Sequence, residues 1–238
     1  MQKIMVIFGA GQGLSLSVAH YYGQKGYQIA LVARREEKLK TLAAKLQAAQ
    51  ISASVFTADL TQQDQIHRVI EEITHHFGTI DAFYYAPNPQ DQFTPAHELQ
   101  PKDLNAKIQL YLYGLMYVVQ DILPLFRQQQ SGLILSAVGG TAVNGYAFMS
   151  GLGPIMAAAR NYLQSLQQEL LSEQIKVGLI TISAQIQQSE SYVAQHETTT
   201  DTTDNAAFPV VHPDTLARLL DQAAQDDSRL EAFYPEQA

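Results

Sequence analysis

The chain has 238 residues, an ordinary length for one α/β domain with a sizeable hydrophobic core. Its formal net charge of −8 at pH 7 argues against non-specific binding to nucleic acid or to anionic membranes. It contains no cysteine, which excludes disulfides and thiolate metal sites and is consistent with a reducing compartment. The first residues lead directly into an apolar run that is too short for a signal peptide, so we expect a cytoplasmic protein.

Short apolar runs alternate with longer amphipathic stretches along the chain. In the first third, strands are predicted over residues 3–8, 28–33, 52–58 and 80–85, and helices over residues 14–23, 36–50 and 62–77. A long apolar helix is predicted over residues 103–126, followed by a strand over 132–137, a helix over 154–172 and a strand over 176–182. A helix over residues 212–225 and a strand over 230–234 complete the pattern.

This alternation predicts an α/β, doubly wound, three-layer Rossmann fold with a central parallel sheet of about seven strands. Neither an internal repeat nor an interdomain linker interrupts it, so we expect a single domain over residues 1–238. Residues 183–208 are rich in Gln, Ser and Thr and show no clear period. They are interpreted as a mobile excursion.

The long apolar helix raises the question of a membrane segment. Residues 108–126 include Gln109, Gln120 and Asp121, and Pro124 lies near their end. A charged residue at the centre of a membrane helix costs about 2.5–3.5 kcal/mol. A helix buried inside the protein or at a subunit interface is the preferred interpretation, and we expect no membrane partner.

A glycine-rich loop joins the first predicted strand to the first helix, with the sequence Gly9-Ala10-Gly11-Gln12-Gly13-Leu14. Glycines let the backbone turn tightly and approach a pyrophosphate, whose charge is met by free N–H groups and by the positive end of the helix. The loop is therefore a candidate dinucleotide site, whose contacts are Gly9, Gly11, Gln12, Gly13 and Leu14. The alternative is a tight turn that binds no ligand.

Two arginines follow the second predicted strand. An NAD site usually has an acidic residue near this position, which binds the ribose hydroxyls. Arg34 and Arg35 instead offer planar cations that suit a 2′-phosphate, and Arg34 is the favoured contact. We therefore expect NADP(H) as the cofactor, with NAD less favoured. The alternative is that both arginines are solvated and pair with Glu36 and Glu37.

Asp59 and Leu60 follow the third predicted strand, at the carboxyl edge of the sheet where ligands lie in this fold. Asp59 could accept a hydrogen bond from an adenine amino group while Leu60 packs against the ring. Asp59 is equally suited to cap the helix that begins near Thr61. Spacing alone leaves both interpretations open.

Together these residues resemble the short-chain dehydrogenase/reductase family. The glycine loop is similar to the family's T-G-x-x-x-G-x-G pattern, with Gly9 and Gly13 kept, Phe8 in place of Thr and Ser15 in place of the last Gly. Residues 32–36 resemble NADP-preferring members, and residues 58–60 resemble the family's adenine contact, which favours that interpretation of Asp59. The likeness covers nearly the whole chain.

The resemblance implies hydride transfer between NAD(P) and a carbonyl or alcohol, with a Tyr-x-x-x-Lys motif, a Ser and an Asn at the reaction centre. The Tyr and Lys positions fall on Leu152 and Met156. The Ser position falls near Gly139, and the Asn position falls near Tyr111. Leu and Met neither donate a proton nor carry a charge. We therefore assign no catalytic residue.

Two further family motifs are altered. The N-N-A-G motif that follows the fourth strand becomes Tyr84-Tyr85-Ala86-Pro87-Asn88, in which Ala86 is kept as a cofactor contact. The Pro-Gly pair after the sixth strand appears as Ser183-Ala184. The departures thus gather on the reactive side, whereas the nucleotide side remains recognisable.

This contrast leaves three hypotheses. The first, which we expect, is a protein that binds NADP(H) without standard hydride transfer and serves as a sensor, regulator or partner subunit. The alternative is an active NADP-dependent oxidoreductase on an unknown carbonyl or alcohol, whose proton comes from a non-standard donor. Hydroxyls are available on Ser136, Thr141 and Tyr111. The third is a relic fold that acts only through oligomeric contacts.

Metal binding is not expected, because the histidines are scattered without the spacing of metal ligands. Self-association is expected. The helix over residues 103–126 and the helix that begins at Pro154 are more apolar than contact with one sheet requires. The corresponding helices pair subunits in the resembling family, so we expect a homodimer or homotetramer.

Overall fold

The computed structural model describes residues 2–88, 93–198, 208–226 and 231–236. Within these ranges, seven strands form one parallel sheet in the order β3-β2-β1-β4-β5-β6-β9. The strands are β1 (Ile4–Phe8), β2 (Gln28–Ala33), β3 (Ala53–Thr57), β4 (Ala82–Tyr85), β5 (Gly132–Gly139), β6 (Ile175–Ile182) and β9 (Ala232–Tyr234). The predicted Rossmann fold with about seven parallel strands is confirmed.

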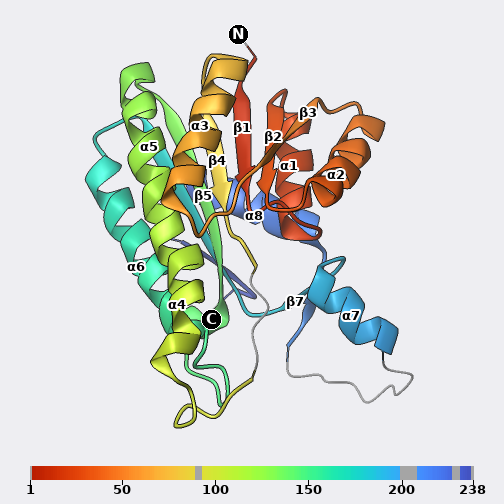
Figure 1. The fold of residues 1–238 in the computed structure, drawn as a ribbon, viewed down its shortest axis with the longest axis vertical. Coiled ribbons are helices and arrows are strands. Elements are labelled where there is room, and N and C mark those ends of the chain that lie inside the picture. The colour runs from red at the N-terminus through yellow and green to blue at the C-terminus, as the bar shows by residue number, and fades with distance from the viewer. Residues whose placement is uncertain (1, 89–92, 199–207, 227–230, 237–238) are drawn as a thin grey trace.

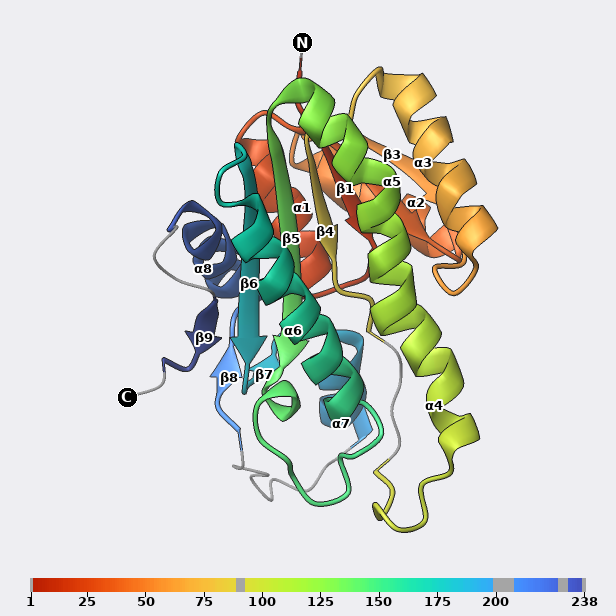
Figure 2. The ribbon, with the colours of Figure 1, turned by 90° about the vertical axis from the view of Figure 1, so that its left-hand side faces the viewer.

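Helices cover both faces of the sheet (Figures 1 and 2). One face carries α3 (Gln63–Phe77), α5 (Gly114–Gln129) and α6 (Gly153–Leu170). The other face carries α1 (Leu14–Gln24), α2 (Glu36–Ala48) and α8 (Pro213–Gln225). Because both faces are covered, the central strands are apolar along their length, and every side chain of β1 is buried.

The predicted long helix is longer than expected at both ends and changes its winding. It consists of α4 (Pro101–Ile108), the π-helix η1 (Gln109–Tyr113) and α5. At the π-turn the hydroxyl of Tyr85 donates to the carbonyl of Leu110, so a side chain enters the regular helical hydrogen-bond pattern. Gly114 permits this approach, because a Cβ there would collide with the Tyr85 oxygen.

By length and composition alone, this long helix could cross a membrane. Its inner face nevertheless packs in the core on the α3–α5–α6 side, through residues such as Leu115, Val118 and Ile122. The helix thus lies along a sheet, as the sequence interpretation requires. The absence of a membrane partner stays a prediction.

The segment over residues 183–208, interpreted as a mobile excursion, contains regular elements that the sequence pattern does not predict. This segment contains β7 (Gln185–Ile186) and α7 (Glu190–Thr198), and β7 pairs with β8 (Val210–Val211) beyond it. The hydroxyl of Ser189 accepts the N–H of Tyr192 at 3.1 Å and so caps α7. A two-residue strand produces no readable period, which is why the sequence pattern missed it. Residues 199–207 lie outside the described ranges.

A buried carboxylate joins α1 to α8. Asp221 accepts hydrogen bonds from the hydroxyls of Tyr22 at 2.6 Å and Tyr21 at 2.9 Å, and from Lys25 Nζ at 2.6 Å. Asp221 and Tyr22 are both buried. Burial raises the pKa of Asp221, but these hydrogen bonds and the charge of Lys25 together hold that pKa below its ordinary value. The cluster therefore ties the last helix to the first.

We expect Asp221→Ala to lower the free energy of unfolding by about 2–4 kcal/mol at pH 7, because it leaves a buried phenol and an ammonium without their acceptor. Urea denaturation measures this value. Asp64→Ala, which removes an exposed carboxylate paired with Arg68, should cost less than about 1 kcal/mol. The charge-dependent part of the Asp221 effect is fully present above the unfolded-state pKa of about 3.9 and disappears as the pH falls through the lower folded-state pKa. Equal losses for the two variants would contradict this role.

Candidate functional site

The carboxyl ends of β1, β2 and β4 meet at one edge of the sheet, at the bottom in Figures 1 and 2. Phe8, at the end of β1, is in register with Val32 of β2 and with Tyr85 of β4. The next residue, Gly9, donates its N–H to the carbonyl of Val32 at 2.9 Å. The glycine loop therefore begins at the point where the strand order reverses, which is the usual ligand position in open α/β sheets.

Two glycines of this loop have backbone conformations that other residues rarely adopt. The φ angle is +78° at Gly9 and +77° at Gly13. At Gly9 there is also no room for a side chain, since a Cβ there would stand 2.7 Å from the Cα of Pro87. Both positions therefore require glycine, for conformational reasons at each and for steric reasons at the first.

The loop leads into the N-terminus of α1. Gly13 is the N-cap residue, and no side chain caps the helix there. The first N–H groups of a helix have no partner within it, so they remain available to an anion. Gly11 is half-buried, with only the Gly9 carbonyl oxygen, at 3.9 Å, near its Cβ position, and Gln12 is exposed, whereas the side chain of Leu14 is buried in the core. Leu14 can thus offer its backbone but not its side chain.

Cationic side chains lie beside the loop, where β2 passes into α2. Arg34 and Arg35 are exposed, and Arg34 forms no ion pair with the residues that the structure describes. Arg35 lies 3.8 Å from a carboxylate oxygen of Glu190, and Lys38 lies 2.6 Å from the same oxygen. The sequence interpretation missed Lys38, although a position three residues beyond Arg35 on a helix shares its face.

The alternative of Arg34 and Arg35 pairing with Glu36 and Glu37 is not found among the described residues. Both glutamates pair instead with Lys40, at 3.0 Å each. The two arginines are therefore not neutralised by their sequence neighbours, and Arg34 remains open to a ligand.

Asp59 lies at the same edge, after β3. One carboxylate oxygen of Asp59 accepts two hydrogen bonds from Thr61, from its N–H at 3.0 Å and from its hydroxyl at 2.8 Å. These bonds form a local turn before α3 begins. Leu60 is 4% exposed, so its side chain has little surface left for an adenine ring. Ala86 follows β4 directly and is half-buried. The adenine contact of Asp59 and Leu60 stays a prediction.

The candidate reactive side lies at the end of β5 and the start of α6. Leu152 precedes α6 and Met156 lies in its first turn, and both side chains are buried. The sulfur of Met156 accepts the N–H of Gly139 at 3.3 Å and lies 3.9 Å from the hydroxyl oxygen of Thr141. The thioether is thus packed against the end of β5, where it brings no charge and only a weak acceptor.

The hydroxyls of Ser136, Thr141 and Tyr111 have different surroundings in the structure. Ser136 is buried and donates to the carbonyl of Tyr85 at 2.6 Å, so it is used within the sheet. Thr141 lies after β5 in the short 3-10 helix η2 (Gly140–Ala142), 3.6 Å from where a Cβ on residue 139 would stand. Tyr111 lies on the π-helix and is buried in the core.

Burial raises the pKa of the Tyr111 phenol well above its ordinary value. The phenol is therefore neutral across the physiological range. Of the two neighbouring tyrosines on the same long helix, Tyr113 is 41% exposed and Tyr117 is half-buried. Among the described residues, no group of acidic, His or Cys side chains could hold a metal ion.

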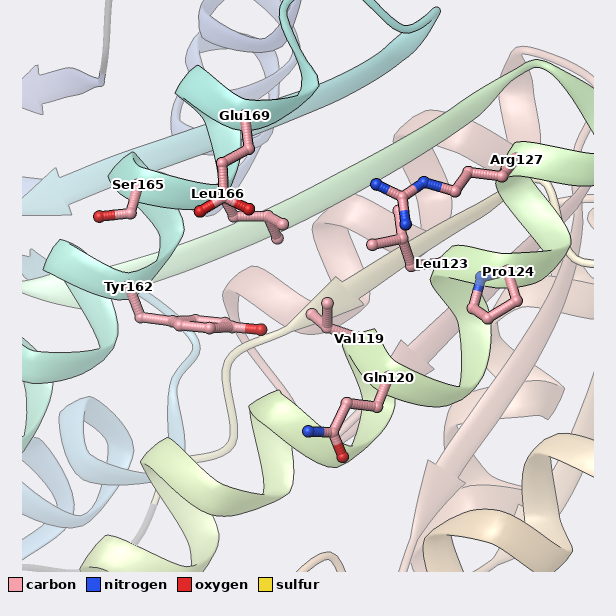
Figure 3. A pocket seen from close by; sticks show the side chains of 9 residues that line it. All are labelled: Val119, Gln120, Leu123, Pro124, Arg127, Tyr162, Ser165, Leu166 and Glu169. Carbon is pink, nitrogen blue, oxygen red and sulfur yellow. The ribbon is translucent and has the colours of Figure 1, made fainter.

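A shallow groove of 340 Å³ lies on the outer surface between α5 and α6 (Figure 3). Its walls are lined by Val119, Gln120, Leu123, Pro124, Arg127, Tyr162, Ser165, Leu166 and Glu169. None of these is a residue of the glycine loop or of the β2 end. The groove therefore belongs to the face on which self-association is expected, and not to the candidate nucleotide site.

Comparison with known proteins agrees with this geometry. The short chain dehydrogenase family matches residues 3–197. An uncharacterized oxidoreductase of Staphylococcus epidermidis is 27% identical over 180 residues, which cover 76% of each chain.

Solved structures show the same fold. ElxO with NADP bound has a TM-score of 0.85 at 17% identity, with 98% of this chain and 96% of that chain covered. L-Sorbose reductase from Gluconobacter frateurii, complexed with NADPH and L-sorbose, has a TM-score of 0.84 at 18% identity, with 98% and 94% covered. The family match spans most of the strands and helices described above, and this chain therefore belongs to the short-chain dehydrogenase/reductase family.

Proposed function

We propose that the chain binds NADP(H) at the carboxyl edge of the sheet and acts as an oxidoreductase on a carbonyl or alcohol. The main support is the glycine cradle, the turn at Gly9 and Gly13, where positive φ angles and the closeness of Pro87 and Ser189 leave no room for a side chain. The uncapped N-terminus of α1 suits the pyrophosphate, and Arg34 with Arg35 suits a 2′-phosphate. The NADP and NADPH complexes of structural neighbours favour the same coenzyme.

Activity is better supported than our first expectation of a protein without standard hydride transfer. The curated relatives that resemble this chain carry the name oxidoreductase, and several span three quarters of it or more. When bound, NADPH supplies a hydride to the carbonyl carbon. The carbonyl oxygen also needs a proton, which the chain or a water molecule has to deliver.

Thr141 is the hydroxyl best placed to orient the substrate oxygen. It lies next to Gly139, the residue that the resemblance aligns with the family's Ser. Its contact in the structure is the weakly accepting sulfur of Met156 at 3.9 Å, so its hydrogen can turn toward a stronger acceptor. Ser136 and Tyr111 are less suited, the first because it already bonds the sheet and the second because it is buried in the core.

A second candidate function is an NADP(H)-binding protein without turnover, which would act as a sensor, regulator or partner subunit. It is favoured by one observation: Leu152 and Met156, which align with the family's Tyr and Lys, are both buried and apolar. Localisation in the cytoplasm stays a prediction. Assembly into a homodimer or homotetramer is proposed through the groove between α5 and α6, where apolar residues such as Val119, Leu123 and Leu166 lie among polar ones.

The first prediction concerns the glycine cradle. We expect Gly13→Ala to weaken NADPH binding about tenfold or more, because the added Cβ would stand 3.1 Å from the Cα of Ser189 in a strained backbone conformation. Gly26→Ala is the matched control, since Gly26 has a φ of +87° with no atom within 4 Å of its Cβ position. Both variants should lose about 1–3 kcal/mol of stability, but only the first should lose affinity in a fluorescence titration. Equal affinities would show that the cradle does not hold the coenzyme.

The second prediction concerns coenzyme preference. Arg34→Ala should weaken NADPH binding about ten- to a hundredfold and leave NADH binding nearly unchanged, because a guanidinium–phosphate pair contributes about 1.5–3 kcal/mol. Arg68→Ala, an exposed residue on α3, is the control of equal charge change. An unaltered ratio of NADPH to NADH affinity in the Arg34 variant would disprove the assignment of the 2′-phosphate.

The third prediction concerns turnover. With a panel of aldehydes and ketones, we expect NADPH oxidation that Thr141→Val lowers about tenfold or more in kcat/KM, whereas Thr141→Ser retains most of it. The NADPH dissociation constant should be the same for both variants. NADPH binding without oxidation on any substrate would favour the second candidate function instead.

A further inference from the structure

A carboxylate of the segment after β6 occupies the cationic end of the candidate nucleotide site. Glu190 is the first residue of α7, and one of its oxygens lies 2.6 Å from Lys38 Nζ and 3.8 Å from a guanidinium nitrogen of Arg35. Lys38 and Glu190 are 152 residues apart in sequence and each is about half exposed. This contact therefore joins α7, in the segment after β6, to α2, the helix that follows the predicted 2′-phosphate contacts Arg34 and Arg35.

The surroundings of Glu190 are electropositive. The helices α1 and α7 both begin here, since a Cβ on Gly13 would stand 3.1 Å from the Cα of Ser189, the cap of α7. Helix N-termini carry partial positive charge, and here two of them lie beside an ammonium and a guanidinium. The hydrogen bond from Lys38 and the nearby charges lower the pKa of Glu190, which keeps the carboxylate ionised. One anionic group thus sits where several positive groups converge.

We propose that Glu190 competes with the 2′-phosphate of NADP(H) for Lys38 and Arg35, and that it thereby sets the preference between NADP(H) and NAD(H). The proposal rests on the proposed function. Both anions need the same two cations, and both cannot be held there without mutual repulsion. NADP(H) must displace the carboxylate, whereas NAD(H) has no phosphate at this position and leaves the ion pairs in place.

The expected magnitude is modest. An ion pair between exposed side chains stabilises by about 0.2–1 kcal/mol, which corresponds to a change of up to about fivefold in a binding constant. Removing the charge of Glu190 frees Lys38 and Arg35 before the phosphate arrives. The binding constant for a 2′-phosphate should therefore rise by about two- to fivefold, and that for an unphosphorylated ribose should not change.

The test is a titration of the full chain with adenosine 2′,5′-bisphosphate and with adenosine 5′-monophosphate, followed by NADPH and NADH. Glu190→Gln should bind the bisphosphate and NADPH about two- to fivefold more tightly than the wild type. The monophosphate and NADH should bind as before. Glu37→Gln makes the same charge change on α2, but its partner is Lys40, so it should leave all four affinities unchanged.

A double variant tests whether the effect passes through Lys38. Lys38→Met should weaken bisphosphate binding, and in its background Glu190→Gln should have a clearly smaller effect than in the wild type, because the closer of the two cations, at 2.6 Å, is absent and only Arg35, at 3.8 Å, remains. Additive effects of the two substitutions would overturn the competition. Circular dichroism melts of each variant establish that the differences do not arise from unfolding.

The remaining outcomes are distinct. If Glu190→Gln weakens NADPH and NADH equally, the carboxylate holds α7 closed over bound coenzyme and the competition is wrong. If it changes nothing while NADPH still binds, the competition is wrong and the proposed function stands. If neither coenzyme binds the wild type, the proposed function and this inference fall together.

Discussion

At Gly9 the chain turns between the ends of β2 and β4. The backbone there passes so close to Pro87 that no side chain fits at position 9. Its N–H is held by the carbonyl of Val32, and its α-carbon faces Pro87, so both neighbouring strands define where the loop begins. This turn aims the start of α1 at the same edge of the sheet at which Arg34 emerges. The positive end of one helix and the position of a guanidinium therefore lie at the same edge of the sheet.

Much of the fold could be predicted from the sequence, because strands buried on both faces are continuous apolar runs and helices carry a period of 3.6. The strand β2 was predicted at its observed bounds, Gln28–Ala33, and β1 within one residue of Ile4–Phe8. The π-turn at Gln109–Tyr113 was not predictable, because it depends on a phenol from β4 that enters the helix. Local sequence contains no record of such a tertiary contact.

The candidate site was predictable to the same limit. The glycines and arginines could be found because they follow strands whose position the period reveals. Lys38 and Glu190 were missed, since their partnership joins segments 152 residues apart and α7 was not foreseen. The reactive side shows the opposite case. The family resemblance puts the expected lysine position at Met156, but only the structure shows the Met156 sulfur against the Gly139 N–H.

At the carboxyl edge of the sheet, the candidate nucleotide site and the candidate reactive side differ in their charged groups. At the nucleotide end the chain gathers cations and helix N-termini, and one carboxylate, Glu190, offsets them in the described structure. At the candidate reactive side the chain has the buried, uncharged side chains of Leu152 and Met156. Proton delivery there would have to proceed through a neutral hydroxyl or water. Without a neighbouring ammonium, the pKa of a neutral donor is not lowered. Lowering the barrier to proton transfer would then depend more on the orientation of the donor and on the exclusion of water. Thr141, whose contact is a weak acceptor at 3.9 Å, is the hydroxyl that we propose for this orientation.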